Sequence, residues 1–157
     1  MNKPIYIFDI DGTLALIGHR LHLLDEKQDA DRWKRFYHKC DSDSPNKPVI
    51  RVMENLRIMG SEILFFTGRT DDVRDKTIAW LAEHTSFMTH DLYQPGILTM
   101  SQVGDYTPDD QLKESWLNDM FLNDVSRIAG VFDDRDRVVN MWRQNGLTCF
   151  QVAKGDF

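Results

Sequence analysis

Ile5-Tyr6-Ile7-Phe8-Asp9-Ile10-Asp11-Gly12-Thr13 joins a short apolar run to two closely spaced acids and a glycine. A run of β-branched and aromatic residues that ends abruptly in polar residues is typical of a buried strand. Because side chains alternate along a strand, Asp9 and Asp11 can share a face, with Ile10 on the other. Gly12 then allows the backbone to turn at once. The stretch therefore predicts two carboxylates presented together at the carboxyl end of a strand.

Such a pair of acids points to a cation. Two carboxylates held this close repel each other unless a positive charge lies between them. A hard divalent ion with oxygen ligands meets this need, and magnesium is the usual one beside phosphate. The other interpretation is a helix N-cap or an Asx turn, although either needs one aspartate and not two. These residues alone leave both interpretations open.

The composition is that of an ordinary acidic globular protein. Of its 157 residues, 41% are hydrophobic and 28% charged, enough to bury the core of one domain. A formal net charge of -6 excludes binding of nucleic acid by an overall positive field, so any basic groove must be local. Cys40 and Cys149 have no metal-type spacing and form no disulfide framework. With no signal-peptide pattern and no apolar run of membrane-spanning length, we expect a reducing, cytoplasmic setting.

Two more apolar runs end in polar residues. Ile63–Phe66 is followed by Thr67-Gly68-Arg69-Thr70, and Ile128–Phe132 by Asp133-Asp134-Arg135. Helical patterns separate the runs, which predicts an α/β fold of the Rossmann-like three-layer α/β/α type with a mainly parallel central sheet. In such sheets ligands gather at the carboxyl ends of the strands. We therefore expect the polar groups of all three runs to meet at one edge.

The remaining elements follow from periodicity and turn residues. We expect helices at 29–40, 48–59, 71–81 and 138–145, short strands at Leu92-Tyr93 and 97–100, and a last strand at 148–152. A further helix is expected to start at Asp109-Asp110 as its cap and to carry Lys113 in its first turn. A lysine there opposes the helix dipole at a small cost. Exposed lysines are common in helices, so its sequence context alone predicts Lys113 at the surface.

Basic residues concentrate between the first two motif-bearing runs. Arg20 is either a phosphate clamp, since a guanidinium matches phosphate oxygens, or an arginine that is exposed or paired with an acid. Taken by itself, the second interpretation is favoured. In the expected helix 29–40 the aromatic residues should be buried. Its cations, among them Arg32, Lys34 and Arg35, either form a solvated face or meet a nucleotide or strand.

Taken in chain order, the motifs resemble those of a known superfamily. Asp9-x-Asp11-Gly12-Thr13, Thr67-Gly68-Arg69, Lys113 and Asp133-Asp134 resemble the four motifs of the haloacid dehalogenase (HAD) superfamily, over essentially the whole chain. Within it the chain is similar to the 3'-phosphatase domain of bacteriophage polynucleotide kinase/phosphatase. That likeness rests on Asp133-Asp134-Arg135, on Val139-x-Met141-Trp142-Arg143 and on the terminal Gln151-Val152-Ala153-x-Gly155-Asp156-Phe157.

Arg20 falls where the phage enzyme carries a phosphate-contacting arginine, but two features depart from that enzyme. Leu21-His22-Leu23-Leu24 replaces the Gly-Pro-Tyr-Asp that follows the arginine. The sequence also contains no Gly-x-x-x-x-Gly-Lys-Ser/Thr P-loop, so no kinase domain is expected in this chain. Both departures bear on whether the substrate is a nucleic-acid end, and neither affects the phosphatase chemistry.

The resemblance implies one HAD-like phosphatase domain over 1–157, with a small helical cap inserted at about 17–46. It implies a magnesium-dependent phosphomonoesterase that removes 3'-phosphate from nucleic-acid ends, in the host cytoplasm if a phage encodes the chain. Asp9 would attack phosphorus to form an aspartyl-phosphate, and Asp11 would act as general acid and base. The implied magnesium ligands are Asp9, the Asp11 carbonyl, Asp133 and Asp134. The groups implied to hold phosphate are Thr67, Gly68, Arg69, Lys113 and Arg20, and substrate selection falls to Arg32, Lys34 and Arg35 in the cap.

Other functions stay in view at this stage. A nucleoside monophosphatase or another small-molecule phosphatase would share all four motifs, because selectivity lies in the cap and in the irregular segment 86–111. A receiver-like phosphoaspartate module, which is not an enzyme, would place its acidic pair first and would lack an acid corresponding to Asp11. A catalytically idle nucleic-acid-binding protein would not need Asp9 and Asp11 together, and the negative charge does not suit it.

Overall fold

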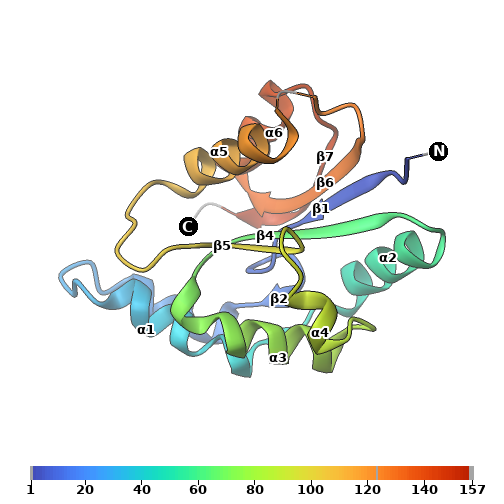
Figure 1. Cartoon of the computed structure of the whole chain (residues 1–157). Helices are drawn as coiled ribbons and strands as arrows, with labels where there is room; N and C mark the ends of the chain where they lie inside the picture. Colours follow the sequence, from blue (N-terminus) through green and yellow to red (C-terminus); the bar gives the residue numbers. More distant parts are fainter. Residues whose placement is uncertain (1, 123, 156–157) are drawn as a thin grey trace.

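A computed structural model describes residues 2–122 and 124–155. Within them, five parallel strands form one sheet in the order β5-β4-β1-β6-β7 (Figure 1). The strands are β1 Ile5–Phe8, β4 Glu62–Thr70, β5 Leu98–Ser101, β6 Ile128–Arg135 and β7 Cys149–Gly155. The first strand of the chain therefore lies in the middle, flanked by the two other strands that lead into motif residues. The predicted α/β fold with a mainly parallel sheet is confirmed.

Helices cover both faces of the sheet (Figure 1). On one face lie α2 Lys47–Ile58, α3 Arg74–His84 and α4 Thr89–Leu92, and on the other α5 Asp109–Phe121 and α6 Asp136–Gln144. Side chains of the central strands alternate between two cores: Phe8 and Phe65 pack with residues of α2, α3 and α4, while Ile7 and Phe66 pack with those of α5 and α6. Burial on both faces explains why these strands are apolar throughout.

The segment between β1 and α2 lies at the carboxyl end of the sheet (lower left in Figure 1). It contains β2 Ala15–Leu16 paired antiparallel with β3 Ser44–Pro45, the 3-10 helices η1 Gly18–Leu24 and η2 Cys40–Ser42, and the short helix α1 Arg32–His38. A 3-10 turn, η3 Asp71–Val73, links β4 to α3. Phe36 of α1 is buried with Ile17 and Leu23 in a small core of the segment's own. The expected burial of aromatic residues in this helix is confirmed for Phe36.

Three local expectations need correction. Leu92-Tyr93 is no strand: Leu92 ends α4 with its side chain buried, and an apolar pair is too short to separate a strand from a helix. The helix expected over 29–40 is shorter at both ends, because α1 begins at Arg32 and 3-10 structure replaces it from Cys40 on. Pro108 takes the cap position of α5, so Asp109 and Asp110 occupy the first turn instead. Asp156 and Phe157, part of the terminal resemblance, lie outside the described residues.

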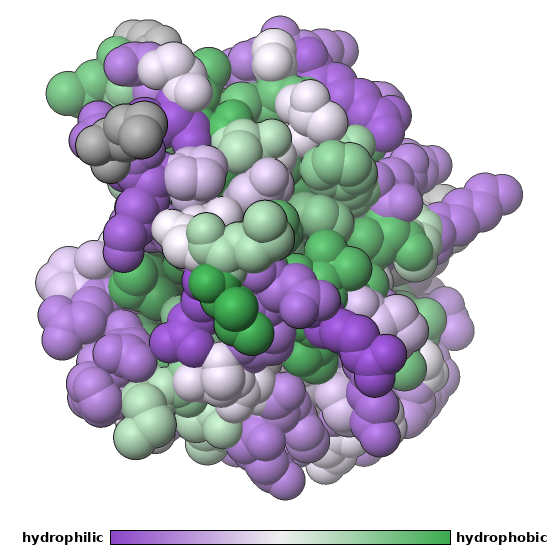
Figure 2. Space-filling view, turned by 90° about the vertical axis from the view of Figure 1, so that its right-hand side faces the viewer, coloured by the Kyte–Doolittle hydropathy of each residue, from purple (hydrophilic) through white to green (hydrophobic). Residues whose placement is uncertain are grey.

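The opposite end of the molecule, where the strands begin, looks different (Figure 2). Hydrophobic side chains gather near the middle of this face, with hydrophilic ones around them. Ile58 and Met59 at the end of α2 and Leu122 after α5 are exposed apolar residues. Every helix in the described part of the chain is too short or too polar to cross a membrane.

Candidate active site

The register of the sheet brings the three motif-bearing strands to one edge. Phe8 is paired with Phe65 of β4 and with Phe132 of β6, so the residues that follow these three leave the sheet side by side. The Asp9 N–H donates to the Phe132 carbonyl at 2.9 Å, which extends the pairing by one residue. Gly12 then turns with a φ of +84°, and a Cβ there would lie 2.1 Å from Asp134 Oδ2. Only glycine fits, because both the backbone angle and the close approach exclude a side chain.

Asp9, Asp133, Asp134 and Lys113 form what we call the acid cluster. One carboxylate oxygen from each aspartate lies within 4.8 Å of the others, and all three residues are buried. Lys113 Nζ donates to Asp9 Oδ1 at 2.7 Å and to Asp133 Oδ2 at 2.9 Å. The expectation of a surface Lys113 was wrong: its side chain is fully buried, because these carboxylates and Asp109, at 3.7 Å, replace its hydration.

The acid cluster holds more negative charge than Lys113 offsets. Burial raises the pKa of Asp9 well above its ordinary value, since the attraction of Lys113 does not fully oppose it. Burial and the neighbouring Asp133 raise the pKa of Asp134 to about 7. Three hard oxygen donors around one point, with an unmet negative charge, fit a divalent cation such as magnesium. The Asp11 carboxylate is not part of this triad.

Asp11, Asp43, Arg20 and Arg69 form a second group, the arginine cluster. Nη2 of Arg20 and Nη2 of Arg69 each donate to Asp11 Oδ1 at 2.6 Å. The same two nitrogens donate to Asp43 Oδ2 at 2.6 and 3.0 Å. Both guanidinium groups are fully buried, and that of Arg20 also lies 4.0 Å above the ring of Phe36. Arg20 is thus a buried, acid-paired arginine at the edge where the motifs meet.

The charges of the arginine cluster act on Asp11 in the opposite direction. Burial by itself would raise the pKa of Asp11, but the guanidinium groups of Arg69 and Arg20 outweigh it and lower that pKa below its ordinary value. Three hydrogen bonds from these arginines reach the same oxygen of Asp11, Oδ1. In this arrangement Asp11 is an ionised carboxylate at neutral pH.

Asp43 is a site residue that sequence reasoning did not find. Its Oδ1 accepts from Arg20 Nε at 2.7 Å and lies 2.8 Å from His19 Nε2, and its carbonyl accepts from Trp80 Nε1 at 2.8 Å. In the sequence it falls in the polar stretch between the helices expected at 29–40 and 48–59. Its role becomes evident only in the fold, because two arginines that are buried beside Asp11 require a second acid.

Between the two clusters lies a cavity of about 20 Å³, lined among others by Asp9, Asp11, Asp134 and Gly68. Thr67 is buried beside it, and its Oγ1 accepts the Arg69 N–H at 3.3 Å. A Cβ on Gly68 would lie 2.9 Å from Asp109 Oδ1, so glycine here lets β4 approach the start of α5. The polar residues that follow the three strands therefore lie at one edge of the sheet, as expected. Asp109, another residue not expected at the site, joins it through this approach.

Residues 3–157 match the family model described as the polynucleotide kinase PNKP phosphatase domain. The chain belongs to this family. It is therefore a HAD-type phosphatase domain and a phosphoric monoester hydrolase, as the motifs predicted.

Solved structures agree with this assignment. Two structures of the Pnkp1/Rnl/Hen1 complex, one of them described as an RNA repair complex, contain chains 28% and 29% identical to this one, each with a TM-score of 0.72. The match covers 100% of this chain but 46% and 48% of theirs, so the PNKP-type domain spans about half their length. A haloacid dehalogenase-like hydrolase from Streptococcus pneumoniae, 11% identical, shares the fold, with a TM-score of 0.60 over 95% of this chain and 84% of its own.

The three cations expected to select the substrate have different surroundings in the PNKP-type domain. Arg35 forms ion pairs with Glu26 and Asp29 within its own segment. Arg32 donates to two backbone carbonyls, those of residues 27 and 29, at 3.2 and 3.3 Å. Lys34 alone of the three lines the wide groove of about 590 Å³ that adjoins the small cavity. Two of the three thus stabilise the α1 segment, and one faces the groove.

Proposed function

We propose that this PNKP-type domain is a magnesium-dependent phosphomonoesterase that forms an aspartyl-phosphate and removes 3'-phosphate from nucleic-acid ends. One observation carries the proposal: Asp9 and Asp11, two residues apart, enter opposite charge environments. Asp9 belongs to the acid cluster and Asp11 to the arginine cluster, and both line the same small cavity. Carboxylates of both clusters line this cavity, and Arg20 and Arg69 pair with the Asp11 carboxylate at its edge.

Asp9 is the nucleophile in this proposal. Its Oδ1 is held by Lys113, and its backbone is fixed by the sheet, so the carboxylate is oriented before substrate arrives. A carboxylate oxygen of Asp9 forms a bond to phosphorus while the bond from phosphorus to the leaving oxygen breaks. Water then attacks phosphorus, phosphate leaves, and the Asp9 carboxylate is restored.

Asp11 moves the protons. It donates one to the leaving oxygen in the first half of the reaction and takes one from water in the second. Arg20 and Arg69 keep Asp11 ionised in this structure, so it must take up a proton from solvent before it can donate one. Its pKa rises enough for this when phosphoryl oxygens accept part of the arginine N–H groups. Thr67, Gly68, Arg69, Lys113 and Arg20 are the groups proposed to hold the phosphoryl oxygens, where they stabilise charge in the transition state.

The acid cluster is the proposed magnesium site, with ligands from Asp9, Asp133, Asp134 and the Asp11 carbonyl. When bound, magnesium supplies positive charge that lets these acids accept a dianionic ester. We further propose that 1–157 is one HAD-like domain in which the segment at about 17–46 is the cap. Its buried Phe36 and Arg20 connect this cap directly to the arginine cluster.

Phosphate release from a 3'-phosphorylated oligonucleotide, measured with and without magnesium, tests the proposal. We expect turnover with magnesium, incorporation of labelled phosphate into protein, and neither result for Asp9→Asn. A 5'-phosphorylated oligonucleotide of the same sequence is the matched control and should react much more slowly. Rapid hydrolysis of the 5' substrate alone would contradict the 3' assignment, and near-normal rates for Asp9→Asn on an activated aryl phosphate would refute the covalent mechanism.

One observation favours a second candidate, a nucleoside monophosphatase. The wide groove beside the site is lined by more acids than bases, which suits a short ligand better than a polyanion. Mononucleotides belong in the same substrate panel for this reason. A kcat/KM for a nucleoside monophosphate far above that for the oligonucleotide would establish this alternative.

A further inference from the structure

The wide groove lies between α1 and the loop that joins β5 to α5. It has a volume of about 590 Å³ and shares five lining residues with the small cavity: Trp33, Tyr37, Gly68, Asp109 and Arg135. A phosphomonoester whose phosphorus lies beside Asp9 therefore extends its leaving group into this groove. The volume is within the usual range for sites that hold a small molecule.

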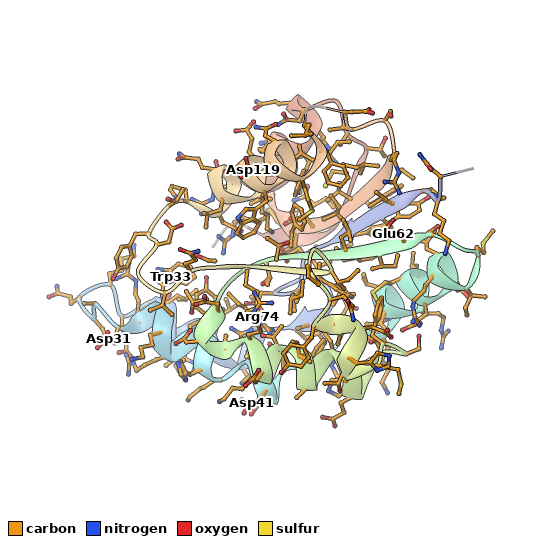
Figure 3. All side chains as sticks on the ribbon, in the orientation of Figure 1. Asp31, Trp33, Asp41, Glu62, Arg74 and Asp119 are labelled. Atoms are coloured by element: carbon orange, nitrogen blue, oxygen red, sulfur yellow. The ribbon has the colours of Figure 1, made fainter. Side chains whose placement is uncertain are left out.

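Aromatic side chains line the groove from both sides. Trp33 comes from α1, where it contacts Phe36 and Tyr37 with ring centroids 5.8 Å apart, and it lies between the helix and the loop (Figure 3). Tyr106 comes from the loop and is 92% exposed. One ring is thus held by packing, and the other is exposed beside the groove, where a flat ligand can contact it. Nucleobases stack on such rings with little dependence on sequence.

The charge of the groove limits how much of a nucleic acid it can hold. Four of its lining residues are acids, namely Asp31, Asp72, Asp105 and Asp109, and three are bases, namely Lys34, Arg135 and Arg137. Arg135 and Arg137 already lie 3.6 and 3.5 Å from carboxylates of Asp109 and Asp110. Lys34 forms no ion pair with any residue that the structure describes. One exposed cation can offset one phosphate, and a row of aspartates repels any others.

Asp109 also offers a contact to a neutral part of the ligand. Its Oδ1 is buried where the small cavity meets the groove and has no hydrogen-bond partner among the described residues. A buried acceptor without a donor is costly, and an O–H or N–H group of a bound ligand removes that cost. The hydroxyl and amine groups of a nucleoside are donors of this kind.

We propose that this groove is a short nucleotide subsite, which holds the terminal nucleoside of the leaving group and one further phosphate at Lys34. The inference rests on the proposed phosphatase function and adds the footprint, that is, the length of substrate that the protein contacts. The base contacts Trp33 and Tyr106, and the strand beyond the next phosphate leaves the protein. The substrate class is accordingly any short or long chain with a 3'-phosphate, read only at its last residues.

Chain length tests the footprint directly. We expect kcat/KM for a 3'-phosphorylated dinucleotide to equal that for a much longer oligonucleotide within about twofold, with the same salt dependence, because each extra phosphate contact would steepen the slope by about 0.7. A kcat/KM that rises with length, together with a steeper salt slope, would overturn the inference. Absence of activity on both lengths would instead refute the proposed function, so the two failures are distinguishable.

Substitution of Tyr106 tests the stacking. Tyr106→Ala should lower kcat/KM for the dinucleotide roughly tenfold and leave a sugar 3-phosphate without a base unchanged. Tyr93→Ala is the matched control, since Tyr93 is also exposed but lies outside the groove, and it should change neither rate. Equal loss on the substrates with and without a base, or no loss on either, would show that Tyr106 does not contact the base.

Discussion

The acid cluster contains Asp9 and the arginine cluster contains Asp11, only two residues further along the chain. The two clusters nevertheless differ in how their charges are balanced. In the acid cluster three carboxylates surround the single ammonium group of Lys113, whereas in the arginine cluster two carboxylates face two guanidinium groups. The pKa shifts follow this difference: that of Asp9 is raised and that of Asp11 is lowered. The acid cluster thus keeps an excess of negative charge, whereas the charges of the arginine cluster balance one another.

Removal of magnesium should cause the largest loss of turnover, because it acts on the acid cluster. Without a cation the three carboxylates repel a dianionic ester, and several kcal/mol of electrostatic stabilisation is lost, so we expect at least a ~10³-fold fall in turnover. The measurement is phosphate release in excess chelator, followed by restoration with magnesium. Full turnover in chelator, with no metal found by elemental analysis, would contradict this account of the acid cluster.

Asp11→Asn should remove the proton transfer and leave both clusters folded. General acid–base catalysis contributes about 10²–10⁴-fold, so kcat for an alkyl phosphate ester should fall by that factor. An aryl phosphate with a good leaving group needs no proton, and its first step should be much less affected, so phosphate should accumulate on Asp9. Rapid-quench measurement of labelled protein checks this. An equal loss for both leaving groups would remove Asp11 from the proton-transfer role.

Asp43→Asn should disturb the arginine cluster without touching the acid cluster. Asp43 holds Arg20 through two nitrogens and Arg69 through one, so its loss lets both guanidinium groups shift. Misplacement by about 1 Å is enough for a loss of roughly 10²-fold in kcat/KM. His19→Gln is the matched control, because the His19 side chain contacts the same carboxylate but is 41% exposed. Unchanged activity of folded Asp43→Asn would rule out a positioning role.

The sequence predicted most of the sheet, because its central strands end abruptly in acids, threonine, glycine and arginine. Two apolar faces on each strand and a parallel order followed from the same pattern. Asp43 could not be found in this way, since its role depends on two arginines 23 and 26 residues away in the chain. Lys113 was judged wrongly from local context, because a buried lysine is stabilised by carboxylates from other elements. Apolar patterns along the chain predict which strands are buried. They do not predict how charged side chains are paired, because that depends on contacts between different elements.

The pH dependence of thermal stability should separate the two clusters, with an effect of a few degrees. An acid whose pKa is raised to about 7 in the folded state, as for Asp134, holds its proton more tightly than in the unfolded chain, where the pKa is about 3.9. Its stabilising contribution is full below the unfolded value and is lost as the pH rises through the folded one. Asp11 has the opposite shift, so its contribution is constant across this window and is lost only in stronger acid.

The contribution of the acid cluster should therefore make the Tm of the metal-free protein lower near pH 8 than near pH 5. Magnesium displaces the proton from this cluster, so the rise in Tm that it causes should be larger near pH 8 than near pH 5. Differential scanning fluorimetry with and without magnesium measures both. Asp134→Asn is the control for all other titrating groups, and the difference between it and the unsubstituted protein isolates Asp134. A magnesium-induced rise that is the same at both pH values would show that no proton is displaced, and the contrast between the two clusters would then not extend to their protonation.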